Sequence, residues 1–237
     1  IGGRVQNDWV WYNEPANLKA APADGGIGAL EDGTFFRRLR LQIKGEAWEV
    51  TEWNFEFDFE SITTFAMDHA WWGVKNVPVL GTIRVGQSKV PMGLESLNDS
   101  KWLTFLERSS SFDAYLLEFS PGIFVSNNYL DQHLTWEAMV HRGPGLAPHT
   151  ADGPSSGADF GVGEYAATAR VTLLPIYEAD GRCLLHLGSS FQWRAAKFDG
   201  ATGFDEFRFR ARSEIRDGNG FGTGSNNNRW IDTGNIA

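Results

Sequence analysis

The sequence has little of several features that mark common protein classes. Its 237 residues include one cysteine, Cys183, which excludes a disulfide framework and a cysteine-based zinc site. Acidic residues outnumber basic residues by 30 to 21, and the net charge of −9 argues against a general nucleic-acid-binding protein. No apolar run approaches the roughly 18 residues of a membrane helix, and the mean hydropathy is −0.31. A helical membrane protein is therefore excluded, but a membrane β-barrel is not, because residues that face a lumen lower the hydropathy.

The sequence is rich in alternating apolar and polar residues. In residues 53–60 every second side chain is aromatic and the side chains between are polar or acidic. Because successive side chains of a strand point to opposite faces, this pattern predicts a strand with one apolar and one charged face. The same alternation marks residues 35–44, 165–173, 183–194 and 207–212, and weaker strands fit 5–12, 67–74, 79–88, 123–128 and 134–141. We expect an all-β, antiparallel protein with ten or eleven strands and turns at 179–181 and 217–228.

Two architectures fit such two-faced strands. In a soluble β-sandwich the apolar face forms the core, whereas in a transmembrane β-barrel it meets lipid and the polar face lines water. The segments reach about ten residues, the length of a tilted membrane strand. Their polar faces also carry bulky arginines. Both features favour the barrel.

Arginines supply the most distinctive chemical feature. Arg208, Arg210 and Arg212 share one strand face at spacings of about 6.6 Å, and Arg216 follows them. Guanidinium groups bind oxyanions through a planar fork, so this row fits a relay for an anion such as phosphate. The same row also fits a solvated face neutralised by neighbouring acids. Arg38, Arg40 and Lys44 form a second cationic face within residues 35–44.

Three carboxylates on one strand face support a different hypothesis. Glu56, Asp58 and Glu60 resemble the Glu-x-Asp-x-Glu strand of jelly-roll β-glucanases, in which paired carboxylates perform glycoside hydrolysis. The alternative function is thus a soluble β-sandwich glycoside hydrolase or carbohydrate-binding module. The same acids could instead offset arginines across a lumen. The sequence predicts no cofactor and no metal site, since His133, His141 and His149 lack nearby ligand partners.

Several blocks, in order, resemble the phosphate-selective porin O/P family of bacterial outer membranes. Residues 36–41 are similar to its Phe-Arg-Arg strand and residues 53–59 to its next strand. Residues 84–95 resemble the strand and turn that enter its constriction loop, residues 100–108 resemble that loop, and residues 208–216 resemble its arginine-rich strand. The resemblance extends over nearly the whole chain.

The resemblance implies a porin β-barrel domain over residues 1–237, one of about sixteen antiparallel strands in a homotrimer, with a candidate constriction loop at 89–111. We expect the chain to be incomplete at its C-terminus and the stretch 144–163 to be an extracellular loop. The implied activity is passive diffusion of small anions, namely phosphate, pyrophosphate or polyphosphate, across the outer membrane, with outer-membrane lipid as a partner and no enzyme activity. A weakly selective pore or a structural outer-membrane protein is a third possibility, because acids on the same face would cancel part of the field.

The resemblance also implies roles for particular residues. The central anion site would comprise Arg37, Arg38, Lys101 and Asp68, and the anion-attracting row would comprise Arg208, Arg210, Arg212 and Arg216. Arg37 shares its parity with apolar residues, so a bulge or the start of the strand must turn it inward. Further candidates for the lumen are Arg40, Lys44, Arg84, Arg108, Arg170 and Arg194.

Overall fold

The computed structural model describes residues 1–19, 32–59, 66–116, 118–142, 165–195, 197–199, 204–206, 209–212 and 229–233. Nine antiparallel strands follow one another in sequence order and form a single sheet, so the all-β prediction is confirmed. The strands are β1 (Gly2–Val10), β2 (Gly33–Ala47), β3 (Thr51–Asp58), β4 (Ala66–Val77), β5 (Gly81–Lys89), β6 (Phe119–Tyr129), β7 (Leu134–Arg142), β8 (Tyr165–Glu178) and β9 (Cys183–Arg194). Among the described residues β1 and β9 each pair with one neighbour, and the sheet does not close on itself.

Shorter elements accompany this sheet. Two further strand pairs are β10 (Lys197–Asp199) with β11 (Phe204–Glu206), and β12 (Arg210–Arg212) with β13 (Arg229–Asp232). Brief helical segments are α1 (Ala16–Lys19), α2 (Leu94–Leu97), η2 (Ser100–Trp102), α3 (Ser110–Tyr115) and η3 (Ala179–Gly181). None of the described helices is long and apolar enough to span a membrane.

Strand connections differ between the two ends of the sheet. At one end the strands are joined by the short turns 48–50, 78–80, 130–133 and 179–182. At the other end the connections are longer and run over 11–32, 59–65, 90–118 and 143–164. The predicted turn at 179–181 is confirmed, and the predicted loop at 144–163 lies outside the described residues.

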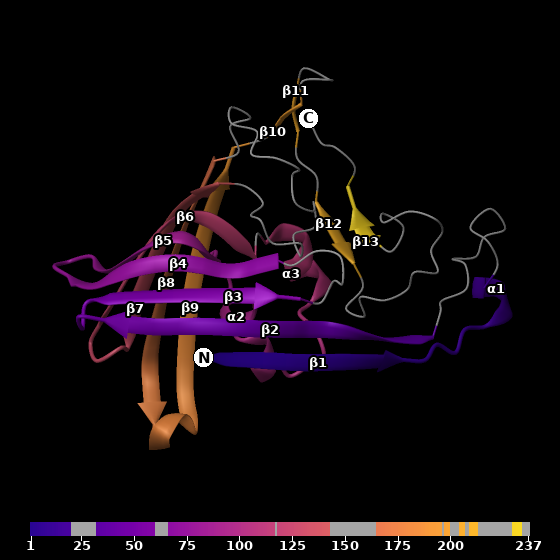
Figure 1. Cartoon of the computed structure of the whole chain (residues 1–237), viewed down its shortest axis with the longest axis horizontal. Helices are drawn as coiled ribbons and strands as arrows, with labels where there is room; N and C mark the ends of the chain where they lie inside the picture. Colours follow the sequence, from indigo (N-terminus) through magenta and orange to yellow (C-terminus); the bar gives the residue numbers. More distant parts are fainter. Residues whose placement is uncertain are drawn as a thin grey trace.

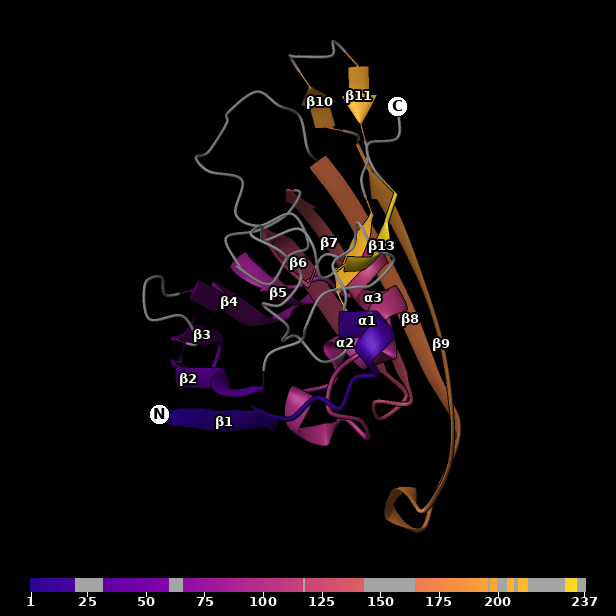
Figure 2. The same ribbon diagram turned by 90° about the vertical axis from the view of Figure 1, so that its right-hand side faces the viewer.

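The sheet curls strongly: in Figure 1 β1–β4 lie across the view, whereas β8 and β9 run from top to bottom. Figure 2 shows the sheet as an arch, with α2 and α3 lying on its concave side. These helices belong to the segment between β5 and β6, which folds back under the sheet. Its first residues, Val90 and Met92, pack on Phe124 and Met139 of the concave face and form a small buried apolar cluster.

The concave face is polar and buried, whereas the opposite face is apolar and exposed. Asp58, Asp68, His141 and Thr168 are all buried. Large apolar side chains on the convex face are exposed instead: Leu41, Ile43, Phe55, Val85, Ile123, Val140, Val171, Phe191 and Trp193. A soluble sandwich buries its apolar faces, so this distribution is the reverse of a sandwich.

Most strands extend beyond their predicted bounds. The predicted strand 35–44 forms the longer β2, and 165–173 forms the longer β8, because neighbouring strands extend both ladders past the region of clear alternation. The predicted strand 207–212 is described in part: residues 210–212 form β12, whereas Phe207 and Arg208 lie outside the described residues.

Candidate functional site

The segment from Val90 to Glu118 is held in shape chiefly by Arg108. The Nε of this arginine donates to the carbonyl oxygen of Glu95 (2.9 Å), and its Nη2 donates to the carbonyl oxygen of Asn98 (2.9 Å). Its Nη1 forms an ion pair with Glu118 at 3.0 Å. The Glu95 carboxylate in turn accepts from the backbone N–H of Ser109 at 2.7 Å. One predicted lumen cation, Arg108, therefore bonds mainly within this segment, which we call the inner loop.

A second contact ties the inner loop to β2. Glu107 lies against the adjacent arginines Arg37 and Arg38, and all three side chains are nearly buried. Arg38 donates through Nη1 and Nη2 to the two carboxylate oxygens at 3.1 and 2.9 Å, and Arg37 donates through Nη2 at 2.8 Å. Burial alone would raise the pKa of Glu107, but the guanidinium groups of Arg37 and Arg38 outweigh burial and hold it below its ordinary value.

A bulge in β2 explains how two consecutive residues point the same way. The register with β1 shifts between Gln6, opposite Arg38, and Asn7, opposite Phe36, so Arg37 is the extra residue. A bulge adds one residue to a strand and so re-aims a side chain, with the ladder of hydrogen bonds disrupted only locally. The structure therefore has a bulge where the alternation required one for Arg37 to turn inward.

A second bulge, in β4, turns the side chain of Asp68 inward. The register between β3 and β4 shifts so that Glu56 pairs with His69 and Phe57 pairs with Met67, which leaves Asp68 as the extra residue. Its side chain is fully buried, and its Oδ2 lies 2.7 Å from Nη2 of Arg40.

Arg40 is the centre of a cluster with three acids. Besides Asp68, its Nε contacts Asp58 at 2.7 Å and its Nη1 contacts Glu56 at 3.3 Å. Each of its three nitrogens thus meets a different carboxylate. Two of the acids considered for glycoside hydrolysis therefore bind one arginine, and nothing in the described residues favours that alternative. The third, Glu60, lies outside them.

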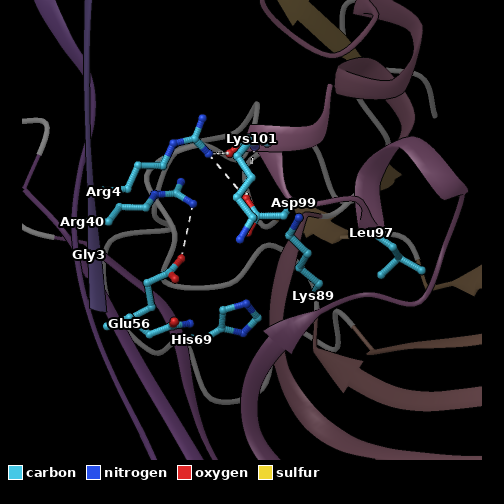
Figure 3. A pocket seen from close by; sticks show the side chains of 11 residues that line it. Gly3, Arg4, Arg40, Glu56, His69, Lys89, Leu97, Asp99 and Lys101 are labelled. Carbon is cyan, nitrogen blue, oxygen red and sulfur yellow. Dashed lines mark hydrogen bonds and ion pairs between the residues drawn. The ribbon is translucent and has the colours of Figure 1, made fainter. Parts of the chain in front are cut away.

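A cavity of about 450 Å³ separates the wall of the sheet from the inner loop. Figure 3 shows Arg4 and Arg40 reaching into it from β1 and β2, opposite Asp99 and Lys101 of the loop. Arg4 lies 3.4 Å from Asp99 and also donates to Ser100. Lys101 lies 3.3 Å from the same Asp99, so the two cations share one carboxylate across the cavity.

Lys89, at the end of β5, also lines the cavity (Figure 3). Its ammonium donates to the carbonyl oxygens of Ser96 (2.6 Å) and Asn98 (3.3 Å) and lies 5.8 Å from the centre of the Phe119 ring. Among the described residues no carboxylate lies within ion-pair distance of it. His69 lines the same wall, with its ring edge-on to Phe119 at 5.1 Å.

Among the other predicted lumen residues, Lys44, Arg84, Arg170 and Arg194 lie on four different strands of the sheet. Arg84 pairs with Glu52 at 2.9 Å and stacks over Trp71 at 4.5 Å. Arg170 pairs with Glu137 at 2.8 Å. Lys44 is exposed opposite Asn54 in the β2–β3 register, and Arg194 lies opposite Ala166 near the end of β9. Arg210 and Arg212 belong to β12, and Arg208 and Arg216 lie outside the described residues.

The structure adds residues that the sequence interpretation did not single out, namely Arg4, Gln6, His69, Lys89 and Glu107. Arg4 faces Arg40 in the β1–β2 register, which could be found only once the two strands were aligned. Lys89 ends a strand and enters the inner loop, a position that could have suggested a role at the loop. Nothing local in the sequence marks Glu107 as a partner of β2.

A curled antiparallel sheet with a charged inner face, an apolar outer face and a loop folded into its concave side is the pattern of an outer-membrane channel wall. The chain belongs to the family described as phosphate-selective porin O and P, whose sequence profile matches residues 17–237. It is 25% identical to Porin O of Pseudomonas aeruginosa over 100% of this chain and 49% of that protein. The chain thus spans about half the length of this curated relative. These matches confirm the resemblance seen in the sequence, whereas the anion-binding roles of individual residues stay predictions.

Proposed function

We propose that the chain forms part of the wall and the constriction of an outer-membrane β-barrel channel through which small anions, phosphate or pyrophosphate, diffuse passively. The cavity lined by Arg4, Lys89 and Lys101 is the observation that carries this proposal. In the whole protein, further strands would pair with the edges β1 and β9, because unpaired backbone groups are costly in lipid. The functional unit would be a homotrimer without enzyme activity.

The apolar side chains exposed on the outer face support the proposal that this face of the sheet lies against lipid. Its exposed apolar side chains form a band that water would disfavour, and tyrosines or tryptophans lie exposed towards both ends of the strands. Aromatic side chains with a polar tip prefer the two membrane–water interfaces. Those near the short turns are Trp48, Tyr129 and Tyr177, and those near the longer connections are Trp9, Tyr165 and Trp193.

The lengths of the strand connections support one orientation of the sheet in the outer membrane. Outer-membrane barrels have short turns on the periplasmic side and longer loops on the extracellular side. The turns 48–50, 78–80, 130–133 and 179–182 would then face the periplasm. The inner loop starts from the opposite, extracellular end and folds down into the lumen.

Charge at the constriction supports anion passage. The side chains that line the cavity include four cations, Arg4, Arg40, Lys89 and Lys101, and two carboxylates, Glu56 and Asp99. The other two acids that contact Arg40, Asp58 and Asp68, are buried, so the lining itself carries an excess of positive charge. The hydrogen bonds of the Lys89 ammonium go to carbonyl oxygens, and an ammonium so placed can exchange them for a permeating oxyanion. Weak successive sites of this kind allow an ion to enter and also to leave.

The test is single-channel conductance of the full-length protein in a planar bilayer, first in a salt gradient and then with added phosphate. We expect an anion-selective reversal potential and a current that phosphate blocks. Lys89→Met should weaken the phosphate block about tenfold, the effect of losing roughly 1.4 kcal/mol of binding.

The matched control is Lys75→Met, which removes a lysine paired with Glu46 near the short turns and distant from the cavity. It should leave the phosphate block unchanged. Cation selectivity of the unaltered channel would contradict the proposal that anions pass through it. Equal effects of the two variants on the phosphate block would contradict a role of Lys89 in phosphate binding.

A further inference from the structure

We propose that two neighbouring short turns, 78–80 and 130–133, lie in the lipid–water interface of the membrane and not in the aqueous compartment beyond it. Their exposed apolar side chains contact the boundary between lipid headgroups and acyl chains. This inference rests on the proposed function, in which the convex face of the sheet meets lipid, and it extends that contact to the turns.

The two turns carry large apolar side chains at positions where polar residues are usual. Val79 is 79% exposed and Leu130 is 68% exposed. Both have left-handed backbone angles, with a φ of 67° for Val79 and 54° for Leu130. Glycine, asparagine and aspartate adopt such angles at little cost, whereas a β-branched residue such as valine is strained there. Since most of the Val79 surface is exposed, the contact that favours valine here lies outside the described residues.

The two turns form one continuous patch. The carbonyl oxygen of Val79 accepts from Nδ2 of Asn127 at 2.9 Å and from the hydroxyl of Tyr129 at 3.2 Å, so the end of β6 reaches the neighbouring turn. On the other side, the ring of His133 lies edge-on to Tyr177 of β8, with the ring centres 6.0 Å apart. We call the exposed apolar and aromatic residues along this line the turn patch: Val79, Leu80, Tyr129, Leu130 and Tyr177.

The turn patch continues the apolar convex face. The hairpin of β8 and β9 extends past the other short turns (Figure 1, Figure 2). The backbone N–H of Leu174 donates to the carbonyl oxygen of His133 at 2.8 Å, so the turn 130–133 lies beside this hairpin. In the extended part of the hairpin, Leu185 lies opposite Ile176 and shares the face of Phe191 on β9, and all three are exposed. The convex apolar face thus reaches as far as the turn patch, and the medium that covers this face covers the patch too.

Several backbone polar groups of both turns are satisfied within the protein. In the turn 78–80, Pro78 has no N–H, its carbonyl accepts from the N–H of Leu80 at 2.8 Å, and the Val79 carbonyl has the two side-chain donors described above. In the turn 130–133, the Leu130 carbonyl accepts from the backbone N–H of His133 at 3.0 Å and from its Nδ1 at 2.8 Å. Water would supply such partners to an exposed turn, whereas an apolar medium supplies none. This internal pairing favours lipid over water as the surroundings of the turn patch.

Spin labels on Val79→Cys and Leu130→Cys measure these surroundings directly. The variants are made in the full-length protein without its native cysteines, Cys183 included, and are placed in phosphatidylcholine vesicles. Electron paramagnetic resonance compares the collisions of each label with oxygen, which concentrates in lipid, and with a water-soluble nickel chelate. We expect more frequent collisions with oxygen at both positions. The control is Asp180→Cys in the exposed tip of the β8–β9 hairpin, where collisions with the nickel chelate should dominate.

The variant Val79→Asn tests the same point through stability. Asparagine suits the left-handed φ, so in a turn exposed to water it would stabilise the protein. In lipid the loss of the apolar side chain outweighs this gain, and the equilibrium constant of unfolding in vesicles should rise about tenfold, the order of the transfer free energy of one valine side chain. The matched control is Glu49→Asn, at a φ of 61° in the turn 48–50, which exchanges one exposed polar side chain for another. It should not raise that constant.

Three results would overturn the proposal. Preferred collision with the nickel chelate at positions 79 and 130 would place the turn patch in water. Protection of both labels from both reagents would place it against protein, such as a second copy of the chain. A Val79→Asn variant as stable in vesicles as the unaltered protein would show that lipid does not contact the valine.

A label on Ile123→Cys, on the convex face, separates this inference from the proposed function. If that label also collides mainly with the nickel chelate, the position of the whole convex face against lipid is wrong. If it collides mainly with oxygen while the labels at 79 and 130 do not, only the inference about the turns is wrong.

Discussion

Arg40 shows how a single residue can hold several strands together. Its three nitrogens contact carboxylates from β3 and β4, and two of these, Asp58 and Asp68, are buried. A buried charge is costly unless a partner offsets it. The arginine therefore stabilises the wall of the sheet more than it attracts ions from the lumen.

Replacement of Arg40 by glutamine should destabilise the protein strongly, because it leaves two buried carboxylates without their cation. We expect a loss of about 3–5 kcal/mol in the free energy of unfolding, measured by denaturant titration in detergent. Arg170→Gln, which removes an arginine with one partner, Glu137, should cost less than half as much. Equal losses would show that the three-acid cluster has no special role.

At the scale of elements, bulges decide which charges enter the concave side. In β2 and β4 the extra residues are Arg37 and Asp68, and both point inward although neither fits the alternation of its strand. A strand alone would send every second side chain to lipid. A bulge thus allows a charged residue at a position of the wrong parity.

Deletion of Arg37 should remove the bulge while preserving the pairing of all other residues of β2 with β1. We expect this variant to refold to a normal β-sheet content in detergent, measured by circular dichroism, with an inner loop that proteases cleave more readily. Deletion of Leu39, which does not lie at a bulge, shifts the parity of the strand and should prevent refolding. Refolding of both variants to the same extent would contradict the assigned register.

At the scale of the whole molecule, the distribution of polarity is reversed relative to a soluble protein. Apolar residues cover the convex face and charged residues fill the concave side, where the inner loop covers them. Such a sheet is stable only where its outer face meets an apolar medium. The two adjacent residues Gln42 and Ile43 point to opposite faces and so report on each environment.

Ile43→Arg should lower the free energy of unfolding in lipid vesicles by about 2–4 kcal/mol, the cost of an arginine facing the middle of a bilayer. Gln42→Arg, on the concave face opposite Glu56, should cost less than about 1 kcal/mol. A larger loss for Gln42→Arg than for Ile43→Arg would show that the faces are assigned the wrong way round.

The sequence by itself determined the strands and their two faces, because alternation is local and a strand needs only its own residues to express it. The segments at 53–60 and 183–194 predicted β3 and β9 in this way, and the ordered motifs were sufficient to identify the family. Only the tertiary structure decided which charges meet. Glu107 reaches Arg37 across 70 residues of chain, and Asp68 meets Arg40 through a bulge that alternation does not reveal. Such contacts depend on the path of the inner loop and on the register between strands, which are set by packing among distant segments and not by any local pattern.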